Sequence, residues 1–133
     1  MSTTLTKEST PQEVRAAWTK ALRSGKYRQG TGCLKVSKPE GLSEYCCLGV
    51  LCDLAVPAGI TTANAEIDND ERGTYILFGD MSAFLPVSVR EWVGNLPEDT
   101  LITMNDKQNA TFEEIATFID NLPIPGVSWS SLI

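Results

Sequence analysis

The pattern of hydrophobic and polar residues predicts an amphipathic helix near the start of the chain. Val14, Trp18 and Leu22 recur at a spacing of four residues, which places them on one face of a helix. Pro11 suits the first turn of this helix, because an N–H there would have no partner within the helix. Gly25 is expected to end the helix.

Short apolar runs separated by turn-forming residues predict the strands. Residues 33–36 have strand character, residues 38–41 predict a turn, and residues 42–46 are expected to return as the second strand of a hairpin. Residues 74–78 are rich in aromatic and branched side chains and predict a further strand. A short strand is also expected at residues 101–104. The sheet is therefore expected to be small and mainly antiparallel.

The same pattern predicts three more helices. In residues 48–55 the apolar side chains lie on nearly all sides, which predicts a buried central helix that stops at Pro57. A third helix is expected over residues 85–92, and a capping box at Thr111 predicts the start of the last one. Residues 61–73 are polar and acidic, so we expect a loop or hairpin tip there.

These elements predict a single α+β domain of about four helices with a small, mainly antiparallel sheet. The domain is expected to span residues 11–122, since a chain of 133 residues suits one domain. Residues 1–10 are polar and are expected to be disordered. Residues 123–133 are apolar but rich in proline and serine. We expect them to form a docking tail, which could equally build a homo-oligomer.

The charge of the chain excludes some classes of partner. The chain has 17 acidic and 11 basic residues and a net charge of −6, which argues against binding to duplex nucleic acid. No apolar run approaches the roughly 20 residues of a membrane span, and no secretion signal precedes the first helix. We therefore expect a cytoplasmic protein with reduced thiols and no membrane partner. Many basic residues lie close together in the first third of the chain: Lys20, Arg23, Lys26, Arg28, Lys35 and Lys38.

Three of the four cysteines, Cys46, Cys47 and Cys52, lie within seven positions of an apolar segment. The chain has no histidine, which is the base that most often activates a cysteine and a common zinc ligand. A helix N-terminus at Cys46 or Cys47 would lower a thiol pKa, so a cysteine-dependent enzyme is one interpretation. The apolar surroundings favour the other interpretation, thiols buried in the core. No metal, cofactor or catalytic residue is expected.

A glycine-rich segment next to the first helix offers the best candidate binding site. It combines cations, aromatic rings and backbone N–H groups, which together can hold a small anion. Cations and an amide would contact phosphate or ribose, tyrosines would stack on a base, and glycines would supply N–H groups. A connector with solvated charges would explain the same residues. The candidate ligand-binding residues are Lys26, Tyr27, Arg28, Gln29, Gly30, Gly32 and Tyr45.

Three segments of the chain form a specific combination of motifs. They are ALRSGKYRQGTGCL at residues 21–34, YCCLGVLCDLA at residues 45–55, and MND with FEEIA within residues 104–116. Together they resemble a family of small proteins found in tailed bacteriophages and prophages. Met104 stands where the family usually has leucine. The resemblance implies an accessory protein that acts on the host, and it carries over no catalytic residue.

Three functions are compatible with the sequence. The first is a phage accessory protein that sequesters a small anionic ligand, such as a nucleotide signal of bacterial immunity, without turning it over. The second is a protein-interaction module that inhibits a host protein, in which the acidic C-terminal two-thirds of the chain and residues 123–133 make the contact. The third is an enzyme that uses Cys46 or Cys47 as its nucleophile.

Overall fold

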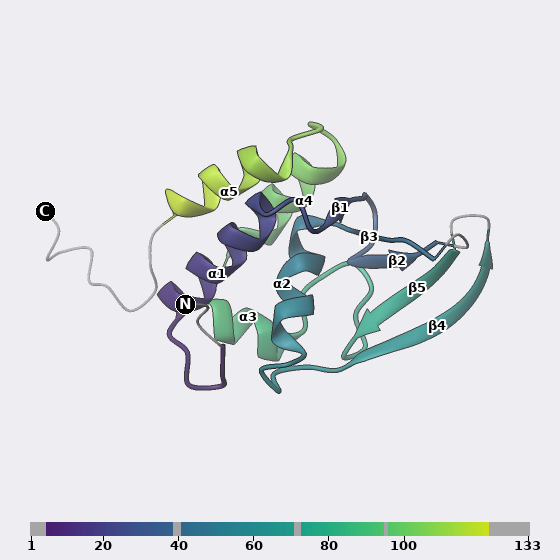
Figure 1. Cartoon of the computed structure of the whole chain (residues 1–133), viewed down its shortest axis with the longest axis horizontal. Coiled ribbons are helices and arrows are strands. Elements are labelled where there is room, and N and C mark those ends of the chain that lie inside the picture. The colour runs from purple at the N-terminus through teal and green to yellow at the C-terminus, as the bar shows by residue number, and fades with distance from the viewer. Residues whose placement is uncertain (1–4, 39–40, 71–72, 95, 123–133) are drawn as a thin grey trace, which may run out of the picture.

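The computed structural model describes residues 5–38, 41–70, 73–94 and 96–122 (Figure 1). In these residues the chain forms five helices and one five-stranded mixed sheet. The helices are α1 (Pro11–Arg23), α2 (Cys47–Ala55), α3 (Val87–Val93), α4 (Glu98–Asp106) and α5 (Phe112–Asp120). The strands are β1 (Arg28–Gln29), β2 (Lys35–Ser37), β3 (Ser43–Tyr45), β4 (Ala63–Asp70) and β5 (Gly73–Phe78). The predicted α+β class is therefore confirmed, with one helix more than expected.

Two helices begin with capping boxes formed by a threonine and a glutamate. At the start of α1, the backbone N–H of Glu13 donates to Thr10 Oγ1 over 3.1 Å, and the N–H of Thr10 donates to Glu13 Oε1 over 2.8 Å. Thr111 and Glu114 repeat this arrangement at the start of α5, as the sequence predicts. Each box satisfies backbone donors that the first turn of a helix leaves without partners.

The sheet has the strand order β1-β3-β2-β5-β4. All neighbouring strands are antiparallel except β1 and β3, which are parallel. The predicted hairpin of β2 and β3 is confirmed, with Lys35 opposite Tyr45 and Ser37 opposite Ser43. In Figure 1 the helices gather on one side of the molecule, while β4 and β5 extend away from them.

The loop predicted for residues 61–73 is wrong over most of its length. Residues 63–70 form β4, which pairs with β5 and lies at the edge of the sheet. Its sequence is polar and acidic, and charged side chains are typical of edge strands because they discourage pairing with further chains. The strand therefore lacks the run of apolar residues on which strand prediction depends.

The short strand predicted at residues 101–104 is also wrong, because these residues belong to α4. A four-residue apolar run is compatible with both a strand and a buried helix. Two acidic residues in the first turn, Glu98 and Asp99, favour the helix by complementing its dipole. Leu101 and Asn105, one helical turn apart, are the buried residues of α4.

The buried central helix predicted from the cysteine block is confirmed as α2. It packs against α1, α3 and α4, and Figure 1 shows it between these helices and the sheet. Trp18 of α1 is fully buried, and its Nε1 donates to the carbonyl oxygen of Cys47 over 2.9 Å. Gly49 lies so close to the segment before β2 that a Cβ atom there would overlap the carbonyl group of Leu34. A glycine is therefore required where the two segments cross.

The structure describes only part of the two end segments of the chain. Residues 1–4 and 123–133 lie outside the described residues, and so do the predicted docking tail and part of the predicted disordered start. Within residues 5–10, the carbonyl oxygen of Thr6 accepts a hydrogen bond of 2.9 Å from Trp92 Nε1. No helix in the described part of the chain is both long enough and apolar enough to cross a bilayer.

Candidate functional site

Three distant segments of the chain meet at the side chain of Asn105, near the end of α4. Asn105 is 2% exposed. Its Oδ1 accepts hydrogen bonds from Gln29 Nε2 over 3.0 Å and from the backbone N–H of Cys47 over 3.3 Å. Its Nδ2 donates to the carbonyl oxygen of Gly30 and to Asp106 Oδ1, both over 2.8 Å. One amide thereby joins the glycine-rich segment, the cysteine block and α4.

Gln29 extends this network to α5. Its Nε2 also donates to the carbonyl oxygen of Ala110 over 2.8 Å, and its Oε1 accepts from the backbone N–H of Phe112 over 3.1 Å. Both N–H groups of the amide are therefore used within the protein. A contact from Gln29 to phosphate or ribose would require at least one of these partly buried hydrogen bonds to break.

The glycine-rich segment has its own internal partners. The N–H of Gly30 donates to the carbonyl oxygen of Tyr45 over 2.7 Å, and the N–H of Gly32 donates to Asp106 Oδ1 over 3.2 Å. A carboxylate thus occupies the place expected for an anionic ligand at Gly32. Gly30 therefore joins the end of β1 to β3, and Gly32 joins the segment after β1 to α4.

The other predicted ligand-binding residues lie within or next to β1 and β3. The rings of Tyr27 and Tyr45 pack edge to face with their centroids 4.8 Å apart. Tyr27 also donates a hydrogen bond of 2.6 Å to Asp53 Oδ2, and burial with this contact raises the pKa of its phenol. Arg28 is exposed, and its Nε lies 3.6 Å from Glu44 Oε2. Lys26 is also exposed. The two tyrosines are therefore adjacent, but one of the nearby cations already faces a carboxylate.

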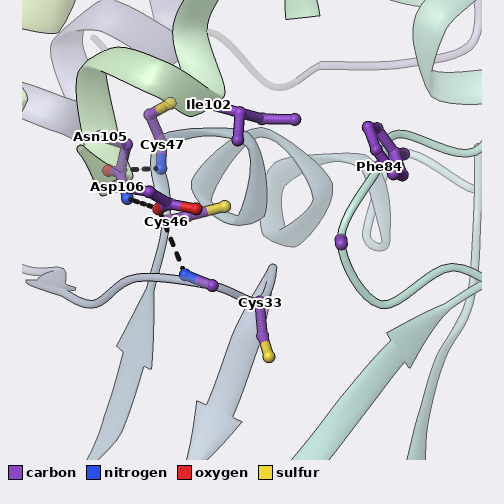
Figure 2. A pocket seen from close by; sticks show the side chains of 9 residues that line it. Cys33, Cys46, Cys47, Phe84, Ile102, Asn105 and Asp106 are labelled. Carbon is purple, nitrogen blue, oxygen red and sulfur yellow. Dashed lines mark hydrogen bonds between the residues drawn. The ribbon is translucent and has the colours of Figure 1, made fainter. Parts of the chain in front are cut away.

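A small pocket with a volume of about 60 Å³ adjoins Asn105 (Figure 2). Of the described residues that line it, only Asp106 carries a charge. Figure 2 shows Phe84 across the pocket from Asn105 and Asp106. The lining residues are Gly32, Cys33, Cys46, Cys47, Ala83, Phe84, Ile102, Asn105 and Asp106.

Two of the cysteines that line this pocket, Cys46 and Cys47, are buried. Cys46 is the N-cap of α2, where its Sγ accepts a hydrogen bond of 3.4 Å from the N–H of Gly49. Burial raises the pKa of Cys46 to about 12, although hydrogen bonds from the helix backbone act in the opposite direction. Burial also raises the pKa of Cys47 and of Cys52 well above the usual thiol value. The predicted burial of these cysteines is confirmed, while Cys33 is partly exposed.

Phe84 also lines a wider groove of about 460 Å³. Glu98 fixes the loop that carries Phe84, because it accepts a hydrogen bond of 3.1 Å from the N–H of Leu85. Arg90 Nε lies 2.5 Å from the other oxygen of Glu98. The groove is lined by Phe84, Arg90, Leu96, Pro97, Glu98, Asp99 and Thr100.

Phe84 is the residue common to both hollows, and its side chain is 46% exposed. Val87, three residues further along the chain, is 63% exposed. Phe84 was not among the predicted site residues, since a single aromatic residue carries no sequence signal that distinguishes exposure from burial. Asn105 was also not predicted as a central residue, although it lies in one of the three segments that carry the phage-family resemblance.

A family model matches residues 10–100, which is more than half of the chain. The chain belongs to the family described as a domain of unknown function (DUF8296). No curated protein and no solved structure matches it. The matched part of the DUF8296 domain contains Gln29, Gly30 and Cys47, whereas Asn105 lies beyond it. The hydrogen-bond network therefore ties the matched region to the helices that follow.

We expect Asn105→Leu to lower the free energy of unfolding by about 3 kcal/mol, measured by urea denaturation. The substitution keeps the volume of the side chain but leaves the N–H of Cys47 and the carbonyl of Gly30 without their partner. Gln108→Ala, at an exposed position just after α4, is the control and should change stability by no more than about 0.5 kcal/mol. Equal stability of the two variants would contradict the central role of Asn105.

We expect iodoacetamide at about pH 8 to alkylate Cys33 in the folded protein and to leave Cys46, Cys47 and Cys52 unmodified. A thiol with a pKa of about 12 is ionised at that pH in roughly one molecule in ten thousand. Peptide mass spectrometry measures the modified sites, and the urea-unfolded chain, in which all four thiols should react, is the control. Rapid alkylation of Cys46 in the folded protein would instead support a cysteine-dependent enzyme.

Proposed function

We propose that this protein is a non-catalytic binding module that attaches to another protein through the surface around Phe84. The observation that carries the proposal is the exposure of this aromatic ring between two hollows. Exposed aromatic residues beside concave apolar surface are frequent anchors of protein interfaces. Val87, three residues further along the chain, is a second exposed apolar residue.

The chemistry around the pocket supports a role in binding. Burial keeps the thiols of Cys46 and Cys47 protonated at neutral pH, so neither is prepared to act as a nucleophile. The pocket of about 60 Å³ is also far smaller than the roughly 300 Å³ at which small-molecule sites begin. It suits one side chain of a partner protein.

We also propose the biological setting. The resemblance of three segments to proteins of tailed bacteriophages supports an accessory protein that acts in the cytoplasm of an infected bacterium. The free thiols of Cys46, Cys47 and Cys52 are compatible with a reducing compartment. The partner would then be a host protein whose activity the module inhibits by covering part of its surface.

We expect a photoreactive p-benzoylphenylalanine in place of Phe84 to cross-link a specific protein when host cells that produce the variant are irradiated. The same substitution at Leu42 is the control, because Leu42 is 52% exposed but lines neither hollow. Gel electrophoresis and mass spectrometry identify the adducts. No adduct from position 84, or the same adducts from both positions, would overturn the proposed surface.

Binding of a small anion is the second candidate function. The observation that favours it is the exposure of Lys26 and Arg28 beside the packed rings of Tyr27 and Tyr45. Lys35 adds a third cation, with its Nζ 5.1 Å from the centre of the Tyr45 ring. Sequestration of a nucleotide immune signal would use these side chains. Gln29, Gly30 and Gly32 would hold the backbone that carries them in place.

If this second function holds, one class of cyclic nucleotide should raise the melting temperature by several degrees at about a hundred times its dissociation constant. Arg28→Ala should strongly reduce the shift, because it removes one of the three cations beside the tyrosine pair. Lys20→Ala, an exposed cation on α1, is the matched control and should keep the shift. A panel without any shift, or a shift that Arg28→Ala leaves unchanged, would exclude this site.

A further inference from the structure

One face of α4 contributes residues to both the pocket and the groove that Phe84 lines. Asp99 lines the groove, and Ile102 and Asp106 line the pocket. These three residues are spaced by three and then four positions, so they lie on the same face of the helix. An aliphatic side chain is thus placed between two carboxylates that are roughly 10 Å apart along the helix axis.

The charged side chains on this face of α4 are acidic. The guanidinium of Arg90 is engaged by Glu98, and among the described residues Asp99 is exposed and forms no ion pair. In the pocket, Oδ1 of Asp106 is held by the N–H of Gly32 and by Asn105 Nδ2. These two bonds fix the carboxylate in place, and both engage the same oxygen.

We propose that this face recognises a basic segment of the partner protein, in which an aliphatic side chain enters the pocket beside Ile102 and flanking lysine or arginine residues pair with Asp99 and Asp106. The inference rests on the proposed function and names the class of partner. The apolar pocket and Phe84 supply the buried contact, and the two carboxylates supply charge complementarity. In an extended segment, about three residues span the separation of the two carboxylates.

The test is a selection from a library of random peptides displayed on mRNA, with the purified full-length protein as bait. We expect enrichment of sequences in which lysine or arginine flanks an aliphatic residue. The affinity of the most enriched peptide for Asp106→Asn should be lower by at least about tenfold. This variant keeps Oδ1 as an acceptor for Gly32, and Asp99→Asn provides an independent second variant.

Two matched controls separate the surface from general effects of charge and hydrophobicity. Glu91→Gln removes an exposed carboxylate from α3 that lines neither hollow, and Leu42→Ala removes an exposed aliphatic side chain elsewhere. Both should bind the enriched peptide like the parent protein. Phe84→Ala should weaken the binding, because the ring separates and lines both hollows.

The outcomes distinguish this inference from the function on which it rests. If enriched peptides lose affinity for Phe84→Ala but show no excess of basic residues, or bind Asp99→Asn and Asp106→Asn like the parent, the basic partner is excluded while the binding surface stands. If no peptide is enriched, or if Phe84→Ala has no effect on the enriched peptides, both proposals are overturned.

Discussion

The fold depends on the satisfaction of buried backbone groups by the side chain of Asn105. The N-terminal end of α2 enters the core, where an N–H group without a partner costs about 1–3 kcal/mol. Asn105 accepts from that end of α2 and donates to the strand segment at Gly30, while Gln29 carries the network on to α5. An apolar side chain of equal volume would fill the space without meeting this requirement.

The same arrangement explains why the buried thiols of the cysteine block have raised pKa values. A helix N-terminus usually offers free N–H groups that stabilise an anion or a thiolate. In α2 the sulfur of Cys46 and the side-chain Oδ1 of Asn105 accept from this end of the helix, and the surroundings are apolar. Desolvation therefore outweighs the helix dipole and keeps the thiols neutral.

The sequence predicted those elements whose signals are local. The capping box at Thr111, the helix on Val14 and Trp18, and the apolar cysteine block each depend on residues a few positions apart. The edge strand β4 and the helix at residues 101–104 were not predicted, because strand pairing and burial decide them. The contacts of Gln29 could not be predicted from the sequence either, since its partners are more than 70 residues away along the chain. Exposure, which distinguishes Phe84 from a core aromatic residue, has no sequence signal of its own.

Asn105 lies beyond the residues that the family model matches, so a chain that ends with the matched region lacks the centre of the hydrogen-bond network. A fragment cut at residue 100 would contain every strand and α2, yet it would lack the partner of the Cys47 N–H and the carbonyl that holds Gln29. On the ribosome, likewise, the network cannot close until α4 and the start of α5 have emerged. These contacts therefore become available late in synthesis, and this favours folding after translation of most of the domain.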